Sequence, residues 1–343
     1  MAIIRTDTMP TAIKAMYVRQ LQLRALPRLL YARWGKPATW TGYDQAEIRK
    51  YHGLNPVTTA LTEGTTPGEQ SAPTISTVTL VPEWYGAWIG YTDKLQIQQY
   101  DDVIAETSQI LGEQAGLSVD TLVRDYLTGG TTVATTMYSG SATTRAGAGT
   151  GLDSNNDKIG YVDFVKALAT LEYAGARPSD GGLFPVIMSP HSWATLMMDS
   201  TFIALFTRQE GDAIRSGNVG TILQARIYLS YNSKEWVDAG EDSADDVYSA
   251  LFIGRDSFAV SGMTGMAPNW NPDGGAPQPH IARGQMTGQA VQVTDLIVKG
   301  LGEGGHDPLN QRGTIGWKLT HTQDSLNIDW ILDLEHTNDF SAS

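Results

Sequence analysis

The feature that most constrains this fold is a long amphipathic stretch between Gln99 and Leu127. Its apolar residues recur at intervals of three and four, as on one face of a helix: Val103, Ile104, Ile110, Leu111, Ala115, Val119, Leu122, Val123 and Tyr126. Asp101 and Asp102 suit the first turn, and Gly129-Gly130 suits the end. At a rise of about 1.5 Å per residue, the spacing predicts a helix about 40 Å long. An ordinary core helix would show the same pattern, so the role of this helix has to be inferred from the segments that flank it.

Residues 1–52 form a basic segment on a chain that is otherwise acidic. They hold nine Lys and Arg against three Asp and Glu, whereas the whole chain has a formal net charge of −13. Large apolar side chains are too few there for a separate core, and Pro27 and Pro37 interrupt helix formation. We therefore expect an arm that lies on another surface. Its charge indicates contact with other copies of the chain or with a polyanion, although a solvated tail would carry the same charge.

The segment Pro56–Thr92 has the pattern of an extended hairpin followed by aromatic residues. Val57–Leu61 leads to a turn-rich tip, and Ser76–Val81 returns with alternating β-branched residues. From Val57 onward the segment holds three glutamates and no Lys or Arg. An isolated pair of strands is marginally stable in water. The hairpin and the aromatic run Trp84–Tyr91 therefore need a partner surface, in this chain or on a neighbour.

The middle of the chain alternates helices with strands and predicts a separate α/β lobe. Residues 128–151 come first, and 20 of these 24 residues are Gly, Thr, Ser or Ala, which predicts a linker or a loosely ordered loop. Ser189-Pro190 is a typical helix start. The segments expected after the loop are a helix over Tyr161–Tyr173, a strand over Phe184–Met188, a helix through Met198, strands over Ala225–Leu229 and Val247–Ile253, an acidic solvated loop over Asn232–Asp246 and an irregular loop over Gly262–Gly284.

Three strands are predicted near the C-terminus, at Val291–Val298, Thr314–Thr320 and Ser325–Glu335. In the last of these, apolar and polar residues alternate, which predicts one buried and one exposed face. We expect it to pair with the two preceding strands against the long helix. That pairing would make one lobe from helix 99–127 plus residues 290–336, with the middle lobe inserted into it.

Patterns that could indicate catalysis or ligand binding are weak. Gly300–Gly305 fits a dinucleotide-binding fingerprint, but no helix is expected after it. Ser189 and His191 are close in sequence, but Ser189 is better explained as a helix cap. Residues Asp153–Asp157 resemble the start of a calcium loop without its glycine and its closing glutamate. The six histidines have no spacing typical of metal ligands. We therefore predict a protein that is not an enzyme and has no cofactor.

The composition bears on the compartment in which such a chain works. The chain has no cysteine, which excludes disulfides and thiolate metal sites and fits assembly in a reducing cytoplasm. It has no run of about 18 apolar residues, and its first residues lack the apolar region of a signal peptide. We therefore expect a soluble chain that is not exported and contacts no membrane.

Three stretches of sequence carry a resemblance to a known family: Thr58–Gly64, Ile187–His191 and Asp307–Lys318, of which the last is the most specific. The order of the expected parts is an arm, a hairpin, a long helix, an inserted lobe and returning strands. This order resembles the HK97-type fold of tailed-phage major capsid proteins. The three stretches are similar to one branch, the coat family typified by the podovirus N-four. The resemblance implies an α+β fold.

In the terms of that family, the resemblance implies five regions. They are an N-terminal arm (1–55), an E-loop hairpin (56–94), the spine helix of the P-domain (95–130), an inserted α/β A-domain with its loops (131–289), and P-domain strands with the C-terminus (290–343). The implied function is that of a major capsid protein. Such a protein assembles into pentamers and hexamers, which form the icosahedral head around the double-stranded DNA of a tailed bacteriophage.

The resemblance also implies which residues meet other subunits. The contacts expected from the E-loop and its base are Thr59, Leu61, Glu63, Val78, Leu80, Trp84, Tyr85 and Trp88. The arm residues expected to face a neighbour or DNA are Arg19, Arg24, Arg28 and Arg33. The residues expected in a P-domain loop are Asp307, Asn310, Arg312 and Trp317. Because the E-loop has no Lys, we expect no covalent isopeptide cross-link from it.

The expected partners are further copies of the chain, a portal, a decoration protein and a scaffold. The scaffold would be a separate protein, since no long scaffolding segment precedes the arm. Packaged DNA would be met through non-specific electrostatics. The protein would belong to the virion after assembly in the cytoplasm of the host bacterium. Two alternatives stay open: an encapsulin-like shell of the same fold around an enzyme cargo, and a monomeric hydrolase or carbohydrate-binding protein of mixed fold.

Overall fold

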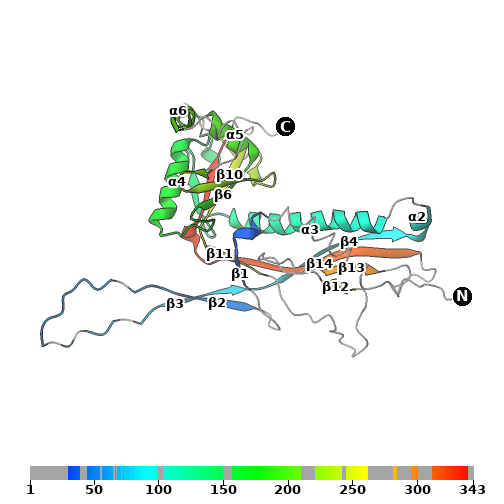
Figure 1. Cartoon of the computed structure of the whole chain (residues 1–343), viewed down its shortest axis with the longest axis horizontal. Coiled ribbons are helices and arrows are strands. Elements are labelled where there is room, and N and C mark those ends of the chain that lie inside the picture. The colour runs from blue at the N-terminus through cyan, green and yellow to red at the C-terminus, as the bar shows by residue number, and fades with distance from the viewer. Residues whose placement is uncertain are drawn as a thin grey trace.

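The molecule has three parts: a compact upper lobe, a long layer in which a helix lies along a sheet, and a thin ribbon that projects from one end of that layer (Figure 1). None of the described helices combines the length and the apolar character needed to cross a membrane. The computed structural model describes residues 30–38, 45–54, 56–64, 66, 68–70, 72–98, 103–149, 157–209, 221–241, 245–261, 281–283, 295–299 and 311–338.

The predicted long helix is confirmed as α3, Val103–Leu127, which has 25 residues and follows the short helix α2, Asp93–Gln98. Its buried apolar residues, each at most 2% exposed, are Leu111, Ala115, Val119, Val123 and Leu127. The expectation that Ile110 shares this face is wrong, because its side chain is 57% exposed. The acidic residues expected in its first turn, Asp101 and Asp102, lie outside the described residues.

Helix α3 lies along a six-stranded sheet that is organised around β14. Strand β14 pairs antiparallel with β4, from Arg312 opposite Thr92 to His321 opposite Glu83. The order is β1-β11-β14-β13-β12 with β4 beside β14, and the strands are β1 (Lys36–Pro37), β4 (Glu83–Thr92), β11 (Phe258–Ser261), β12 (Ile281–Arg283), β13 (Asp295–Lys299) and β14 (Arg312–Ser325). The strands predicted at 291–298 and 314–320 are confirmed in type, whereas residues 281–283, expected to be irregular, form a strand.

The ribbon consists of β2, Ala46–Tyr51, paired antiparallel with β3, Ile75–Leu80. This pairing corrects the predicted hairpin, because residues 57–61 are not in a strand and β2 falls in the segment expected to be arm. Half-buried and exposed residues alternate along β2, as the pleat requires. The sequence does not show this alternation, because the charged Lys50 lies on the half-buried face. A lysine can bury its aliphatic stem there while its ammonium group reaches solvent.

The upper lobe is built on a seven-stranded mixed sheet in the order β5-β15-β10-β6-β8-β7, with β9 beside β10. Ser189 caps the start of helix α5, because its Oγ accepts a hydrogen bond from the N–H of Ser192 at 3.0 Å, so the predicted cap is confirmed. The elements are β5 (Thr135–Tyr138), α4 (Tyr161–Tyr173), β6 (Phe184–Met188), α5 (Pro190–Met198), α6 (Ser200–Gln209), β7 (Thr221–Ile222), β8 (Ala225–Leu229), β9 (Glu235–Trp236), β10 (Val247–Ile253) and β15 (Ile331–His336). The helices and strands predicted for the middle of the chain are confirmed, although β9 lies within the expected acidic loop.

The last strand, β15, is in the upper lobe and not in the sheet under α3, which corrects the predicted pairing. It lies between β10, antiparallel, and β5, parallel, and all six of its residues are buried. The expected exposed face is therefore also wrong, since Asp333 and Glu335 are each 1% exposed. Both carboxylates have partners: Ser249 Oγ donates to Asp333, and Arg145 donates to Glu335 at 2.6 and 2.7 Å. Paired polar groups make the buried position tolerable.

The loop 128–151, expected to be loosely ordered, is largely fixed by polar contacts. It contains β5 and a short 3-10 helix at residues 145–147. The carboxylate of Asp157 accepts N–H groups from Ser141 and Ala142 at 2.8 and 3.2 Å, and from Gly149 at 3.1 Å. Arg145 also stacks on the ring of Trp236, 3.8 Å from its centroid. The Asp157 carboxylate, which resembled a calcium ligand in the sequence, thus accepts backbone N–H groups of this loop. The other two residues of that resemblance, 153 and 155, lie outside the described part.

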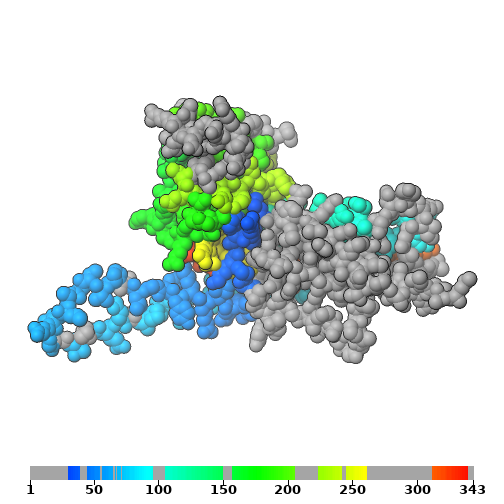
Figure 2. All heavy atoms as spheres, in the orientation of Figure 1, coloured from blue at the N-terminus to red at the C-terminus, as the bar shows by residue number. Residues whose placement is uncertain are grey.

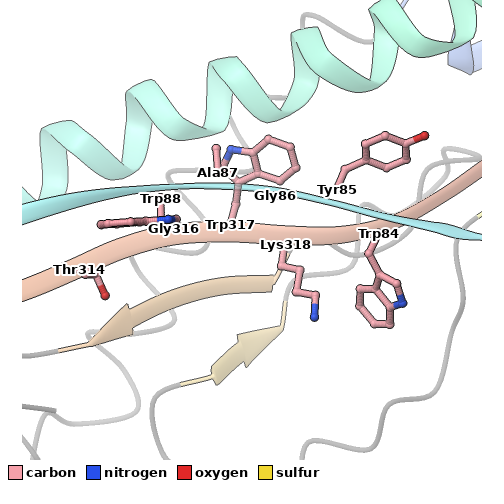
Figure 3. Close-up of a pocket in the computed structure, with 9 residues that line it drawn as sticks. All are labelled: Trp84, Tyr85, Gly86, Ala87, Trp88, Thr314, Gly316, Trp317 and Lys318. Atoms are coloured by element: carbon pink, nitrogen blue, oxygen red, sulfur yellow. The ribbon is translucent and has the colours of Figure 1, made fainter. Parts of the chain in front are cut away.

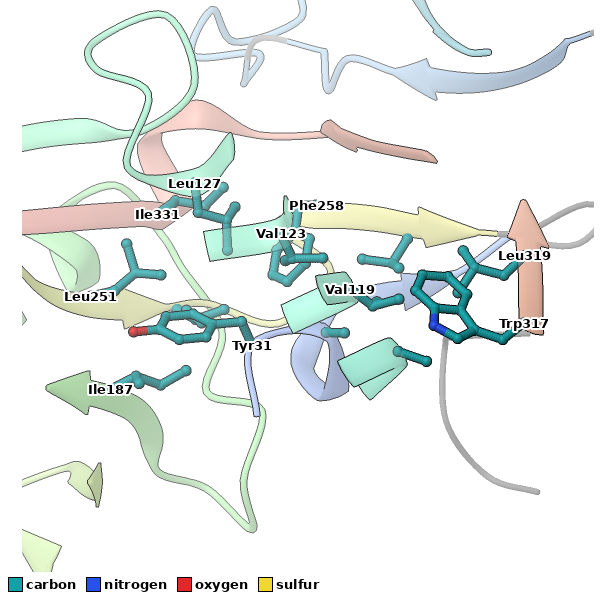
Figure 4. Packing of buried hydrophobic residues seen from close by; sticks show 14 of the residues in the cluster. Tyr31, Val119, Val123, Leu127, Ile187, Leu251, Phe258, Trp317, Leu319 and Ile331 are labelled. Atoms are coloured by element: carbon teal, nitrogen blue, oxygen red, sulfur yellow. The ribbon is translucent and has the colours of Figure 1, made fainter. Parts of the chain in front are cut away.

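A short strap, residues 30–38, passes between the upper lobe and α3. Tyr31 and Ala32 are fully buried in the main apolar core, where Tyr31 lies beside Leu251 and Ile187 (Figure 4). The Asp120 carboxylate of α3 accepts the N–H groups of Leu30 and Tyr31 at 2.7 and 2.8 Å. Burial raises the pKa of Asp120, and these N–H donors partly offset the shift. This part of the arm has no core of its own and lies on another surface, as expected, and that surface belongs to the same subunit.

Replacing Asp120 with alanine is expected to lower the free energy of unfolding by about 3 kcal/mol, because it leaves buried N–H groups of the strap without an acceptor. Urea denaturation followed by circular dichroism measures the change. The control is Asp125→Ala on the same helix, whose half-exposed ion pairs are worth less than about 1 kcal/mol. Equal losses in the two variants would contradict the anchoring role.

Asp333 makes the stability of the subunit depend on pH. Burial, and then the nearby Glu335, raise its pKa to about 7, against a lowering by the Ser249 hydroxyl and by Arg145. Between about pH 4 and pH 7 the folded chain therefore binds a proton that the unfolded chain has lost. This contribution to stability is complete below the unfolded pKa and is lost as the pH rises towards 7.

Asn cannot ionise, so Asp333→Asn is expected to remove this fall of a few kcal/mol, while Asp238→Asn, at an exposed turn, keeps it. Thermal unfolding of each chain is compared between pH 5 and pH 8. His321 and His336, whose pKa burial lowers to about 4, act in the opposite direction in every chain and cancel in the difference. A variant as pH-dependent as the unchanged chain would disprove the assignment.

Candidate assembly interface

The described residues of the ribbon loop, residues 52–74, are exposed, and His52 at its base bonds to Ser76 of β3 at 3.0 Å. Every described residue from Tyr51 to Ile75 is exposed, including Leu54, Val57 and Leu61 at 55%, 70% and 75%. The two strands at its base pair only with each other in the described part of the chain. Figure 2 shows the loop as a thin extension that lies well away from the upper lobe. Apolar side chains held out in this way mark a surface for another molecule.

The predicted hairpin contacts fall into two groups. Thr59, Leu61 and Glu63 lie in the exposed loop. Val78 is half-buried on β3, and Leu80 is fully buried where the ribbon joins the body. Leu80 therefore supports its own subunit and presents no surface to a neighbour, which corrects that prediction.

The predicted contacts Trp84, Tyr85 and Trp88 lie on β4, in the sheet under α3 and not on the ribbon. Side chains alternate across this sheet, so one set faces α3 and the other faces away. Tyr85 and Trp317 point towards α3, while Trp84 and Lys318 point to the opposite side (Figure 3). Trp317 Nε1 donates to Gln114 of α3 at 3.2 Å.

The face of β4 and β14 turned away from α3 carries a shallow groove of about 490 Å³ (Figure 3). Trp84 and Trp88 bound it, and their side chains are 46% and 73% exposed. Lys318 Nζ lies 4.0 Å from the ring centroid of Trp84, a cation–π contact that holds both side chains in place. We call this feature the tryptophan groove.

Glycines form the floor of the tryptophan groove because the backbones of β4 and β14 approach closely there. A Cβ at Gly86 would lie 2.7 Å from the carbonyl oxygen of Trp317, and one at Gly316 would lie 2.8 Å from that of Ala87. No other residue fits either position without displacing the backbone. The resulting floor is flat main chain, which another extended chain can approach.

The sequence predicted the two tryptophans but missed Lys318 and Gly316 on the neighbouring strand. Lys318 pairs with Gly86, and Gly316 pairs with Trp88, across strands far apart in the chain. The alternation of Trp and Gly from Trp84 to residue 90 was the available signal for a flat floor between aromatic walls.

The remaining predicted residues are dispersed. Trp317 is 4% exposed and belongs to the core, whereas Arg312 is exposed at the start of β14. Arg33 is exposed on the strap, and its guanidinium lies 5.1 Å from the ring centroid of Trp34. The other predicted arm and loop residues lie outside the described part: Arg19, Arg24, Arg28, Asp307 and Asn310, together with the glycine-rich turn 300–305.

Among the described residues, no set of three or more His, Cys, Asp or Glu side chains comes together that could hold a metal ion. Ser189 bonds to Ser192, within its own helix cap. The described surfaces with distinctive chemistry are thus the ribbon loop and the tryptophan groove, both suited to protein–protein contact.

Comparison with solved structures finds phage capsids. The chain is similar to the capsid of Ralstonia phage GP4, with 15% identity, a TM-score of 0.63 and 91% of each chain covered. It is similar to the capsid of cyanophage P-SCSP1u, with 12% identity, a TM-score of 0.62, and 91% of this chain and 89% of that chain covered. It is also similar to the cyanophage Pam1 capsid, with 12% identity, a TM-score of 0.58, and 98% of this chain and 94% of that chain covered. At these identities the likeness shows the fold, which is HK97-type.

No curated protein matches the sequence. A family described as phage capsid protein matches residues 75–323, which is most of the chain. The match includes α3, the tryptophan groove and most of the upper lobe. The chain therefore belongs to the phage capsid protein family, and it is a major capsid protein of the head shell.

Proposed function

We propose that neighbouring subunits in the shell complete one another through the ribbon loop, so that each loop lies on the next subunit of a pentamer or hexamer. The observation that carries this proposal is the exposure of every described residue from Tyr51 to Ile75. A loop of this length without secondary structure is uncommon in a compact domain unless it serves binding. Head-to-tail contacts of this kind close into rings, and rings tile into an icosahedral head.

The energy for assembly comes from the same side chains. Burial of a leucine or valine side chain contributes about 1.5–3 kcal/mol, and Leu54, Val57 and Leu61 are available in each loop. Each subunit both gives a loop and receives one, so modest contacts add over a ring. Since the sequence has no Lys from Val57 to Thr92, the loop has no amine for an isopeptide cross-link and the contact is non-covalent.

The head encloses double-stranded DNA, in this proposal, through charge and without sequence readout. The net charge of −13 keeps the wall weakly repulsive to packaged DNA, and the basic arm supplies local attraction to DNA or to an acidic neighbour. Arg33, which is exposed on the strap, is a described basic residue of that arm. The role is structural, and no catalytic step is assigned to the chain.

Further proteins complete the virion in this proposal: a portal, a decoration protein and a separate scaffold, with assembly in the bacterial cytoplasm. Membership of the phage capsid family disfavours the encapsulin-like shell and the monomeric hydrolase. The narrower resemblance to the coat family of the podovirus N-four stays a prediction.

Removing the loop tests the proposal directly. Tyr51 and Ile75 are paired across the ribbon, so Asn-Gly can replace residues 52–74 as a two-residue turn. The subunit is expected to keep its urea midpoint, because every described residue that is removed is exposed, and to form no shells by electron microscopy. The control exchanges the same residues for a Gly/Ser loop of equal length, which should fold and also fail to assemble. Normal shells from either variant would refute the role of the loop.

A further inference from the structure

We propose that the strap is a pH-responsive switch. A buried polar cluster between the upper lobe and α3 holds residues 30–38 in place while Asp333 is protonated, and ionisation of Asp333 lets the strap detach. The inference goes beyond the proposed function, because it concerns how the arm is attached to its own subunit and does not depend on the ribbon loop.

The face of the upper-lobe sheet that is turned towards α3 has an apolar half and a polar half. Leu251 and Ile331 belong to the core that this sheet shares with α3 and the strap. Alternate residues of a strand share one face, so Ser249 of β10 and both Asp333 and Glu335 of β15 lie on the same face as these two apolar residues. Ser249 and Glu335 are directly paired. The polar cluster therefore continues the joint between the upper lobe and α3.

Tyr31 connects the strap to both halves of this face. Its ring packs in the apolar core beside Leu251 (Figure 4), and its hydroxyl is hydrogen-bonded to Ser233. Ser233 Oγ donates to the carbonyl oxygen of Ser249 at 3.1 Å, and Ser249 Oγ donates to the Asp333 carboxyl. Tyr31 and Asp333 are each 1% exposed, so solvent scarcely reaches either group while the strap is in place.

The charges near Asp333 compensate its ionised form only weakly. Glu335 carries a like charge, and Arg145 is bound to Glu335 by two hydrogen bonds of 2.6 and 2.7 Å. Burial is the main cause that raises the pKa of Asp333 to about 7, Glu335 adds to it, and the Ser249 hydroxyl and Arg145 oppose it. The other titratable or charged side chains that face the cluster are Tyr138 on β5, Tyr31 on the strap, and Asp120 and Arg124 on α3.

The strap is the part of this joint that opens most easily. An ionised Asp333 needs water or further donors, because a buried charge without them is unstable. Strand β15 is paired with β10 on one side and β5 on the other, so the sheet itself gives no access. The backbone of the strap is held by the bonds from Leu30 and Tyr31 to Asp120 and by the two-residue pairing of β1 with β11. A short segment with few contacts opens at a lower free energy than a sheet.

Detachment of the strap lengthens the basic arm. Nine extended residues span about 30 Å, and the strap carries Arg33 and Lys36, both exposed. The attached state holds a proton on Asp333 that the detached state loses at a lower pH. A rise in pH towards 7 therefore favours detachment, and the effect levels off above that value. Acid pH keeps the arm short, and a higher pH lets it reach further towards a neighbour or DNA.

Hydrogen exchange of the full chain, measured by mass spectrometry, tests the switch. Peptides from the strap are compared with peptides from the centre of α3, after correction for the intrinsic exchange rate at each pH. The opening equilibrium of the strap is expected to rise about 20-fold between pH 5.5 and pH 7.5, since detachment returns the pKa of Asp333 from about 7 to about 4. Asp333→Asn should remove this rise, and the control Asp238→Asn, at an exposed turn, should keep it.

A strap that opens more readily than α3, and that loses protection with rising pH only where Asp333 is present, supports the inference. Equal protection of the strap and α3 at every pH would mean that the strap opens only when the whole subunit unfolds, which overturns it. Strap opening that does not depend on pH, or a rise of the same size in Asp333→Asn, also overturns it. Each of these outcomes leaves the proposed function standing, since the loop deletion tests that function separately.

A second variant provides the test where Asp333→Asn folds poorly. Ser249→Ala removes the hydroxyl that lowers the pKa of Asp333, so the pH midpoint of strap opening is expected to shift upward. The matched control is Ser118→Ala, which removes a hydroxyl that bonds within α3 and should leave the midpoint unchanged. The same midpoint in Ser249→Ala as in the unchanged chain would refute the switch.

Discussion

The apolar face of α3 packs on β14, and the other parts of the subunit depend on that contact. Leu111, Ala115 and Val119 supply one side of it, while Trp317 and Leu319 supply the other. The same core continues through Val123 and Leu127 into the upper lobe, so one helix joins two bodies (Figure 4). A 25-residue helix is long enough to serve both, and its burial leaves the far side of the β4–β14 sheet free for other contacts.

Buried carboxylates join the parts where apolar packing does not reach. Asp120 holds the strap, Asp157 organises the loop before α4, and Glu335 fixes Arg145 against Trp236. Each has N–H donors in place of water, which is the condition under which a carboxylate tolerates burial. These hydrogen bonds require defined directions between donor and acceptor. They therefore fix the position of the strap on α3 and of the loop segments within the upper lobe.

The outer surfaces follow a different rule, since they leave apolar groups exposed. The ribbon loop offers an extended strand and the tryptophan groove offers aromatic walls on a flat floor. In a subunit that forms a shell, exposed apolar groups of this kind are available to contacts with identical copies, as proposed for the ribbon loop. On the β4–β14 sheet the core lies on the face towards α3, and the tryptophan groove lies on the other face.

Local pattern determined much of this protein: the span of α3, the cap at Ser189, and the helix and strand limits from Tyr161 to Ile253. The resemblance supplied the family. Tertiary structure decided which strands pair, because period-two alternation identifies a strand without its neighbour. It placed β15 in the upper lobe, where partners from distant segments bury Asp333 and Glu335, and it set Lys318 opposite Gly86 to make the groove. From sequence alone, charged side chains are expected to be exposed. Only the fold shows which of them are buried beside hydrogen-bond donors.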